Sequence, residues 1–158
     1  MDHPQLHDKH FADRKEIMIT NTPERPQPRF PEPDTEPFWE ATKYRDLKYQ
    51  TCDQCNNVIF YPRGHCPSCG FNGTTWNVSK GEGSVYTFSV VMQSRHPAFK
   101  DIGPYAVGYV DLDEGFRIMT NIVGVSEPIK SIQCGMRVKL IWKDQGEGKI
   151  ALPMFEPA

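Results

Sequence analysis

The sequence lacks any long run of apolar residues. No stretch approaches the roughly 18 consecutive apolar residues that a helix needs to span a bilayer. The first fifteen residues are rich in His, Asp and Lys, without the apolar stretch of a secretory signal. We therefore expect a cytoplasmic protein that does not contact a membrane.

The sequence also lacks an excess of positive charge. Its 18 Lys and Arg residues are balanced by 20 Asp and Glu residues, which gives a formal net charge of −2. Proteins that bind nucleic acid without sequence preference need a basic excess, because neutralising phosphates supplies most of their affinity. We therefore expect no nucleic-acid partner. A nucleic-acid-binding module stays an alternative, which salt-sensitive binding to single-stranded oligonucleotides would reveal.

Cysteine is scarce, and its number is odd. Five cysteines in 158 residues do not form a complete set of disulfides, and the cytoplasm keeps thiols reduced. Four of them fall in two Cys-x-x-Cys pairs separated by ten residues, namely Cys52, Cys55, Cys66 and Cys69. Two such pairs can surround one tetrahedral ion. The sequence therefore predicts a zinc ribbon with these four thiolates as its ligands.

The residues next to the pairs support this interpretation. Such a motif turns sharply after its second cysteine, where a positive φ helps, and Asn56 and Gly70 stand at those positions. Four cysteines fill the coordination shell, so the metal is predicted to be structural rather than catalytic. Iron in a rubredoxin-like site is the alternative, because four thiolates accept either metal. An oxidised iron site would make the protein red.

Other chemically capable residues are few. We expect Cys134 to be a small buried residue at the entry of a strand. Arg63, between the cysteine pairs, and Arg95, His96 and Lys100, in one loop, are the candidates for contacts to a phosphate-bearing ligand. Ordinary solvated charge is the alternative interpretation. No catalytic triad, paired-carboxylate motif or glycine-rich phosphate loop stands out, so we predict no catalytic site of the chain's own.

Proline density and hydrophobic period divide the chain into three regions. Residues 1–33 hold a proline cluster and are predicted to form an extended arm. Residues 34–80 are predicted to form a short helix, ending near Asp46, and then the ribbon. Residues 81–158 are predicted to form a separate β domain.

The last region alternates with a period of two in five segments. One segment groups Tyr86, Phe88 and Val90, and the turn Asp113-Glu114-Gly115 joins the next two segments. Five short antiparallel strands in so few residues are typical of a small closed barrel, most often an OB-fold. The predicted fold is therefore mainly β, with an N-terminal helix, a rubredoxin-like zinc ribbon and a five-stranded OB-fold barrel.

The order of these motifs resembles the DUF35 family over about residues 34–157. The matching motifs are Phe38-Trp39, Cys52-x-x-Cys55, Cys66-Pro67-x-Cys69, Gly81-x-Gly83-x-Val85-Tyr86-Thr87-Phe88, Pro104-Tyr105-Ala106-Val107, Leu112-Asp113-Glu114-Gly115 and Leu152-Pro153-x-Phe155. The resemblance implies the fold of this family, a rubredoxin-like zinc ribbon followed by an OB-fold.

The resemblance implies a role that composition does not. It implies a non-catalytic, zinc-binding subunit that stabilises a thiolase-fold partner in a hetero-oligomer and helps bind a coenzyme A thioester. The partner would then be a thiolase, an acyl-CoA acyltransferase that carries the catalytic residues. The resemblance extends to thiolases of aromatic-compound degradation, with benzoylsuccinyl-CoA as a candidate substrate. Hydroxymethylglutaryl-CoA synthase, aldolase and hydratase partners are the alternatives that it leaves open.

Overall fold

The computed structural model describes residues 25–27 and 32–158, so most of the predicted arm (residues 1–33) lies outside the described residues. The elements are α1 Glu36–Thr42, β1 Lys48–Cys52, β2 Val58–Ile59, β3 Thr74–Val78, β4 Glu82–Val91, β5 Tyr105–Leu112, β6 Arg117–Ile122, α2 Pro128–Ser131, β7 Arg137–Lys143 and β8 Leu152–Pro157. The chain is mainly β, as predicted. In the described part of the chain, no helix is long and apolar enough to cross a membrane.

Helix α1 is short and has one buried side. Pro37 in its first turn costs little, because that N–H would have no partner inside the helix. Phe38 and Ala41 are buried against the rest of the protein. The helix ends earlier than predicted, because Arg45 turns the chain with a positive φ of 64°. Tyr44 lies beyond the end of the helix and is 79% exposed.

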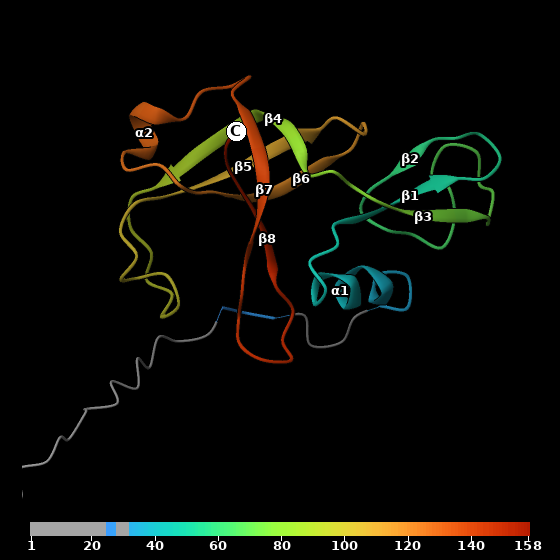
Figure 1. The fold of residues 1–158 in the computed structure, drawn as a ribbon, viewed down its shortest axis with the longest axis horizontal. Helices are drawn as coiled ribbons and strands as arrows, with labels where there is room; N and C mark the ends of the chain where they lie inside the picture. The colour runs from blue at the N-terminus through green and yellow to red at the C-terminus, as the bar shows by residue number, and fades with distance from the viewer. Residues whose placement is uncertain (1–24, 28–31) are drawn as a thin grey trace, which may run out of the picture.

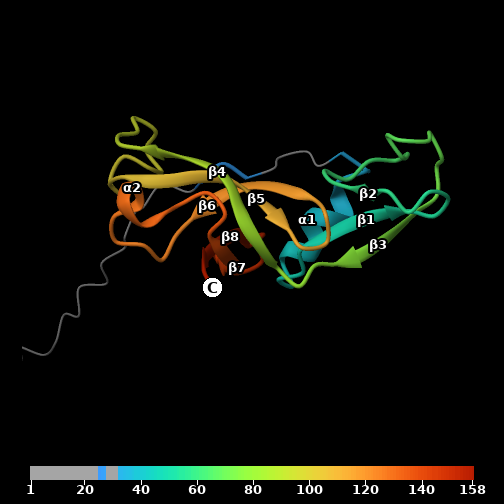
Figure 2. The ribbon, with the colours of Figure 1, turned by 90° about the horizontal axis from the view of Figure 1, so that it is seen from above.

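The ribbon is a three-stranded antiparallel sheet in the order β2-β1-β3. Strand β1 pairs with β3 along its whole length, from Lys48 opposite Val78 to Cys52 opposite Thr74. Strand β3 was not predicted from the sequence. Its residues are mostly polar and half-buried or exposed, so they show no clean alternation of apolar and polar positions. Figures 1 and 2 show the ribbon projecting to one side of the barrel.

The five predicted barrel strands are confirmed, and they close in the order β4-β5-β6-β8-β7. Their pairings are antiparallel except that of β6 with β8, which is parallel at Ile122 and Phe155, so the prediction that all the strands are antiparallel is wrong for this pair. Strand β4 contains a bulge, because Val85 pairs with Val110 while Thr87 pairs with the adjacent Tyr109. The extra residue is Tyr86, which is 54% exposed, whereas Val85 is fully buried. A bulge reverses which residues of a strand face inward from that point on. The alternating pattern grouped Tyr86 with Phe88 and Val90, but the bulge separates Tyr86 from the regular alternation of these two residues.

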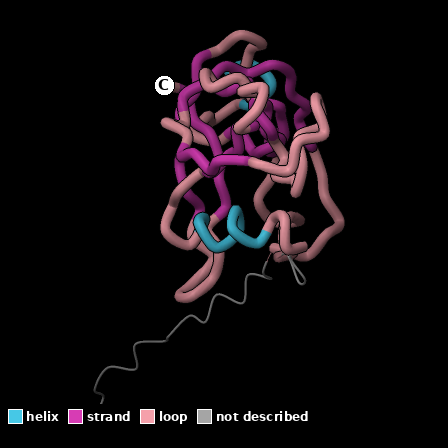
Figure 3. Tube along the Cα trace, turned by 90° about the vertical axis from the view of Figure 1, so that its right-hand side faces the viewer, coloured by secondary structure: helices cyan, strands magenta, loops and turns pink. Residues whose placement is uncertain are grey.

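A single apolar core joins the barrel to α1 and to the ribbon. It contains Phe38 of α1, Phe116 beside β6 and Phe155 of β8. The ring of Tyr49 in β1 stacks on Phe116 with centroids 5.0 Å apart. Trp39, Trp76 and Trp142 are partly buried and pack against this core. Figure 3 shows α1 as the cyan helix below the strands.

The junction between ribbon and barrel is held by polar contacts. Glu114 accepts hydrogen bonds from the Ser79 hydroxyl at 3.0 Å and from the Lys80 backbone N–H at 2.7 Å. Gly81 follows with a φ of 74°, and a Cβ there would lie 2.4 Å from Cβ of Leu140. Only glycine fits this approach, so the first strand of the barrel starts in one orientation relative to the ribbon.

Candidate metal centre and apolar groove

The four predicted metal ligands come from two similar turns of the ribbon. In each turn a backbone N–H bonds to the carbonyl of the first cysteine, from Asn56 to Cys52 and from Gly70 to Cys66, both at 2.9 Å. Asn56 has a φ of 57° and Gly70 a φ of 77°. The prediction of positive φ at these two positions is therefore confirmed, and the two turns present their sulfurs in equivalent ways.

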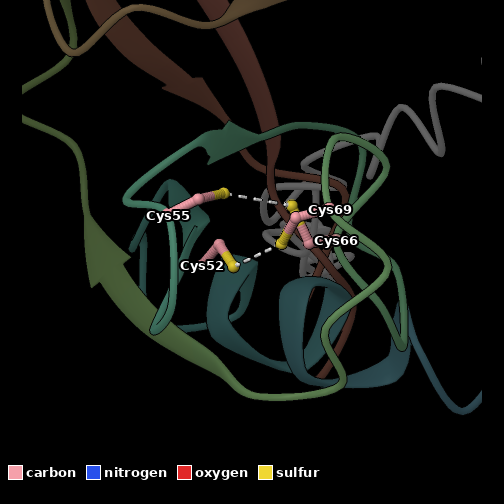
Figure 4. A group of neighbouring side chains, drawn as sticks. All are labelled: Cys52, Cys55, Cys66 and Cys69. Atoms are coloured by element: carbon pink, nitrogen blue, oxygen red, sulfur yellow. Dashed lines mark hydrogen bonds between the residues drawn. The ribbon is translucent and has the colours of Figure 1, made fainter.

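The sulfur atoms of Cys52, Cys55, Cys66 and Cys69 all lie within 4.8 Å of one another. Figure 4 shows the side chains converging from the two turns, and each dashed line joins a sulfur of one turn to a sulfur of the other. These distances are 3.6 Å from Cys52 to Cys69 and 3.7 Å from Cys55 to Cys66. A tetrahedral ion with metal–sulfur bonds of about 2.3 Å fits sulfurs at this separation. The cluster is therefore positioned to bind a metal.

The thiols affect each other's protonation. Burial raises the pKa of the Cys66 thiol. The backbone N–H groups of Cys69 and Ser68 and the nearby thiols lower it by more than burial raises it, so the pKa is about 7. A backbone N–H of Asn57 lowers the pKa of Cys55, but its hydrogen bonds to nearby thiols and burial together raise it to about 12. Clustered thiols therefore cannot all ionise unless a cation neutralises them. A divalent metal ion supplies that neutralisation.

The donor set also defines what such an ion can do. Four thiolates complete a tetrahedral shell and leave no open position for water or substrate. The ribbon's own apolar cluster consists only of Cys52, Ile59 and Cys66, so two of its three members are ligands. A sheet with so little core needs another source of folding free energy, and a bound metal provides it. The centre fits a structural ion.

An apolar groove of about 430 Å³ lies between α1, the ribbon and the barrel. It is lined by Arg25, Phe38, Trp39, Tyr61, Phe99, Tyr105, Val107, Ile118, Met119, Thr120, Asn121, Leu152, Pro153 and Met154. Tyr61 of the ribbon crosses to the barrel here, and its hydroxyl accepts a hydrogen bond from the Met119 backbone N–H at 3.3 Å. The groove has the size of a small-molecule site, for which about 300–1,000 Å³ is usual.

Arg25 is the charged residue that lines the groove. Its Nη1 donates a hydrogen bond to Oδ1 of Asn121 at 3.1 Å, and its guanidinium lies 5.0 Å from the centre of the Phe99 ring. Burial lowers the pKa of Arg25, while Tyr105 raises it. Arg25 was not predicted as a site residue. It belongs to the predicted arm, where no sequence signal indicated a contact with the barrel.

The predicted phosphate contacts lie elsewhere. Arg95, His96 and Lys100 are exposed on the β4–β5 loop, and Arg63 is exposed on the ribbon. Figures 1 and 2 show this loop and the ribbon at opposite ends of the molecule, so the structure does not bring the four residues together. None of them lines the groove, although Phe99 of the same loop does. Their binding of a phosphate stays a prediction.

Cys134 is exposed, so the prediction that it is buried is wrong. It lies in the turn before β7, where Gly135 has a φ of 82°. The strand begins three residues later, at Arg137, and Val138 takes the buried position expected for the cysteine. The prediction was wrong because it placed the start of this strand near Cys134, whereas β7 starts at Arg137.

The outer face of the barrel carries exposed apolar side chains. Tyr86 is 54% exposed, Tyr109 42% and Met119 55%, and they belong to the adjacent strands β4, β5 and β6. Tyr109 and Met119 are paired across β5 and β6. Met119 also lines the groove, so this face and the groove are continuous. Apolar residues gathered on a surface in this way are typical of a binding face.

The fold and the cysteine cluster define a class of protein, a zinc-ribbon protein with a C-terminal OB-fold. Two family models match the chain: the rubredoxin-like zinc ribbon domain of ChsH2 at residues 39–72 and the C-terminal OB-fold domain of ChsH2 at residues 76–143. The chain belongs to the ChsH2/DUF35 family.

Two curated relatives are similar to this chain in sequence. It is 35% identical, over 106 residues, to a DUF35 domain-containing scaffold protein of Methanothermobacter thermautotrophicus. That match covers 65% of this chain and 77% of the relative. It is 36% identical, over 149 residues, to a probable enoyl-CoA hydratase alpha subunit of Thermomonospora curvata. That match covers 94% of this chain but only 45% of the relative, so the chain spans less than half of that protein.

The structural matches agree with the sequence matches. A chain of the Ltp2–ChsH2(DUF35) aldolase superposes with a TM-score of 0.74 at 37% identity, covering 83% of this chain and 98% of that chain. A DUF35 protein of unknown function from Sulfolobus solfataricus superposes with a TM-score of 0.60 at 13% identity, covering 82% of this chain and 89% of that chain. The second match supports the fold alone.

Proposed function

We propose that this chain is a non-catalytic, zinc-binding scaffold subunit that assembles with a larger acyl-CoA enzyme. One observation carries the proposal: the chain matches 98% of a DUF35 chain from a structure named as an aldolase, at 37% identity. A scaffold-protein name recurs among the sequence relatives. The partner contributes the catalytic residues, and this chain stabilises the assembly and helps bind the coenzyme A thioester.

Cys52, Cys55, Cys66 and Cys69 hold zinc in this proposal. Their convergence and the full thiolate shell support the assignment. The metal supplies rigidity, because it locks two turns that have almost no apolar core of their own. Metal analysis of the purified chain distinguishes zinc from iron: about one zinc per chain and no visible colour supports the assignment, whereas a red protein containing iron contradicts it.

The partner has a thiolase fold in this proposal, and benzoylsuccinyl-CoA is the candidate substrate. The exposed face formed by Tyr86, Tyr109 and Met119 offers a surface for such a partner. Arg63, Arg95, His96 and Lys100 are the candidate contacts for the phosphates of coenzyme A, since all four are exposed. The resemblance to the family supports the thiolase, and the capture experiment below tests it.

A hydratase is the second candidate partner. The supporting observation is the match to the probable enoyl-CoA hydratase alpha subunit, which extends over 94% of this chain. Thiolase and hydratase partners differ in fold and in catalytic residues, so identifying the captured protein separates the two candidates.

The experiment is affinity capture of the tagged full-length chain from its native host, with partners and stoichiometry determined by mass spectrometry. We expect a stoichiometric acyl-CoA enzyme with its own catalytic residues. A variant with Tyr109 and Met119 both changed to Glu should lose the partner while keeping zinc, whereas C134S should keep both. Recovery of the wild-type chain alone, or with nucleic acid, contradicts the proposal.

A further inference from the structure

The groove contains an arginine whose surroundings are unusual for this protein. Arg45 and Arg137 are exposed, and they pair with Asp144 at 2.9 Å and with Asp113 at 2.7 Å. Arg25 is half-buried, yet it has no carboxylate partner among residues 25–27 and 32–158. A guanidinium removed from water without an acidic partner is unfavourable, and a carboxylate that reaches it offsets that cost.

The neutral partner of Arg25 is itself held in place. Asn121 donates a hydrogen bond from Nδ2 to the carbonyl of Ala106 at 3.0 Å, which turns its Oδ1 toward Arg25. The guanidinium also lies over the Phe99 ring, which stacks in turn on Tyr105 with centroids 5.6 Å apart. The guanidinium is therefore positioned by a residue of β6 and a residue of the β4–β5 loop. Among the described residues, its guanidinium donates one hydrogen bond, to Asn121, and a guanidinium has five N–H donors, so donors remain there for a bidentate contact.

The rest of the groove suits an aromatic or branched apolar group. Five of its lining residues are aromatic, namely Phe38, Trp39, Tyr61, Phe99 and Tyr105. Aromatic side chains hold a flat ring by edge and face contacts. The combination of apolar walls and a few polar groups that fix orientation is the usual composition of a small-molecule pocket.

From these contacts we propose that the groove binds the acyl part of the substrate, and that this acyl part carries both a bulky apolar or aromatic group and a free carboxylate. Arg25 binds the carboxylate, and the walls formed by α1, Tyr61 and Phe99 hold the apolar group. The inference rests on the proposed function, because it takes the ligand to be an acyl group presented as a coenzyme A thioester. It adds the place on this chain where the acyl part binds and a specificity-determining residue, Arg25.

The test uses the full-length zinc-loaded chain and two small probes that differ in charge, phenylpropanoate and its neutral analogue phenylpropanamide. Binding is followed by two-dimensional NMR at the indole N–H of Trp39 and the side-chain amide of Asn121. We expect phenylpropanoate to bind at least about tenfold more tightly than the amide, because a charge-assisted bidentate contact is worth more than a neutral one. The changes in signal should be confined to groove residues.

Two matched variants sharpen the test. R25M keeps most of the side-chain volume but removes the charge, and it should bind acid and amide about equally. R45M removes an exposed arginine that does not line the groove, and it should keep the wild-type preference. Zinc content and the dispersion of the NMR spectrum check that both variants are folded. R25K should recover part of the preference, because it restores the charge without the bidentate geometry.

Three outcomes overturn the inference: equal binding of acid and amide by the wild type, a preference that R25M retains, or no change at the groove up to the solubility limit of the probe. Loss of the captured partner in R25M without any probe binding by the wild type assigns the groove to the partner protein, and this also overturns it. These outcomes leave the scaffold proposal intact if the wild-type chain still captures an acyl-CoA enzyme. Specific probe binding without a captured enzyme would instead contradict the scaffold proposal alone.

Discussion

The ribbon and the barrel are both small β structures, but different forces stabilise them. The ribbon's own buried cluster is Cys52, Ile59 and Cys66, whereas the barrel buries large side chains such as Val110, Ile122 and Phe155. The barrel closes on itself, and the ribbon is an open sheet of three strands. The comparison teaches that a metal can replace a hydrophobic core where the chain is too short to build one.

The two regions are nevertheless not independent. Tyr49 and Phe60 of the ribbon both pack on Phe116 of the barrel, with ring centroids 5.0 Å and 4.7 Å apart. Phe38 of α1 contacts Phe60 in turn, at 5.7 Å. The ribbon therefore shares the barrel's core through these aromatic contacts, and we expect a metal held by its four cysteines to stabilise its turns. Variants that affect one region and leave the other intact are the way to separate these contributions.

The largest expected effect follows from replacing a metal ligand. In C66S the shell loses a buried thiolate, and structural zinc sites contribute roughly 10–16 kcal/mol of apparent binding free energy. We expect zinc to fall from about one ion per chain to nearly none. The NMR signals of residues 52–74 should lose dispersion while barrel signals persist. Metal analysis and NMR check this.

C134S is the matched control for that prediction, because Cys134 is exposed and lies outside the cluster. It should keep zinc and stability unchanged. A C66S chain that retains a full equivalent of zinc would show that the shell is not built from these four cysteines.

The second effect concerns the barrel core. In F155A a side chain that is 0% exposed is removed, and we expect the free energy of unfolding to fall by about 3–5 kcal/mol. Urea unfolding followed by tryptophan fluorescence measures this change, and the milder F155L serves if F155A does not fold. M119A, at a position 55% exposed, is the control and should change stability little. Comparable losses in F155A and M119A would contradict the assigned core.

The third effect is smaller and concerns the junction between the two regions. Gly81 and Gly103 both have positive φ, 74° and 68°, but only at Gly81 would a Cβ meet another atom closely. In G103A we expect a cost of roughly 1–2 kcal/mol from the left-handed backbone alone. In G81A the clash with Leu140 should add roughly 1–3 kcal/mol. Urea unfolding of the two variants compares them directly, and equal costs would mean that Leu140 moves aside freely.

The smallest effect is a pH dependence of the exposed ion pairs on the barrel. Hydrogen bonds from Arg117 and Arg137 lower the pKa values of Asp111 and Asp113, respectively. Because these folded-state pKa values lie below the unfolded ones, the stabilisation is present at neutral pH. It is lost as the pH falls through the lowered values, below the ordinary aspartate pKa of about 3.9.

D113N is the variant that isolates this contribution. It should have a slightly lower melting temperature than the wild type at pH 7, and the difference should vanish near pH 2. Acid also releases zinc from thiolate sites, so the comparison is between the two proteins at each pH. A difference that persists in acid would show that the carboxylate charge is not its cause.

Much of this protein follows from local patterns in its sequence. The spacing of the cysteines predicted a cluster whose sulfurs converge, because two residues between paired ligands allow both to reach one point. Asn56 and Gly70 marked the positive φ positions, because few other residues adopt them at low cost. Alternation in the last region predicted the barrel strands, since one face of each strand must be apolar.

Other features depended on contacts between distant parts of the chain. The bulge at Tyr86 and the exposure of Cys134 depend on how strands pair, which a local pattern does not contain. The groove is formed by the arm, α1, the ribbon and the barrel together, and Arg25 meets Asn121 across 96 positions of sequence. The sequence alone determined the metal ligands' convergence and the class of fold, because both rest on short-range spacing. Only the tertiary structure decided where a charged side chain lies in an apolar groove, because that requires segments far apart in the chain to come together.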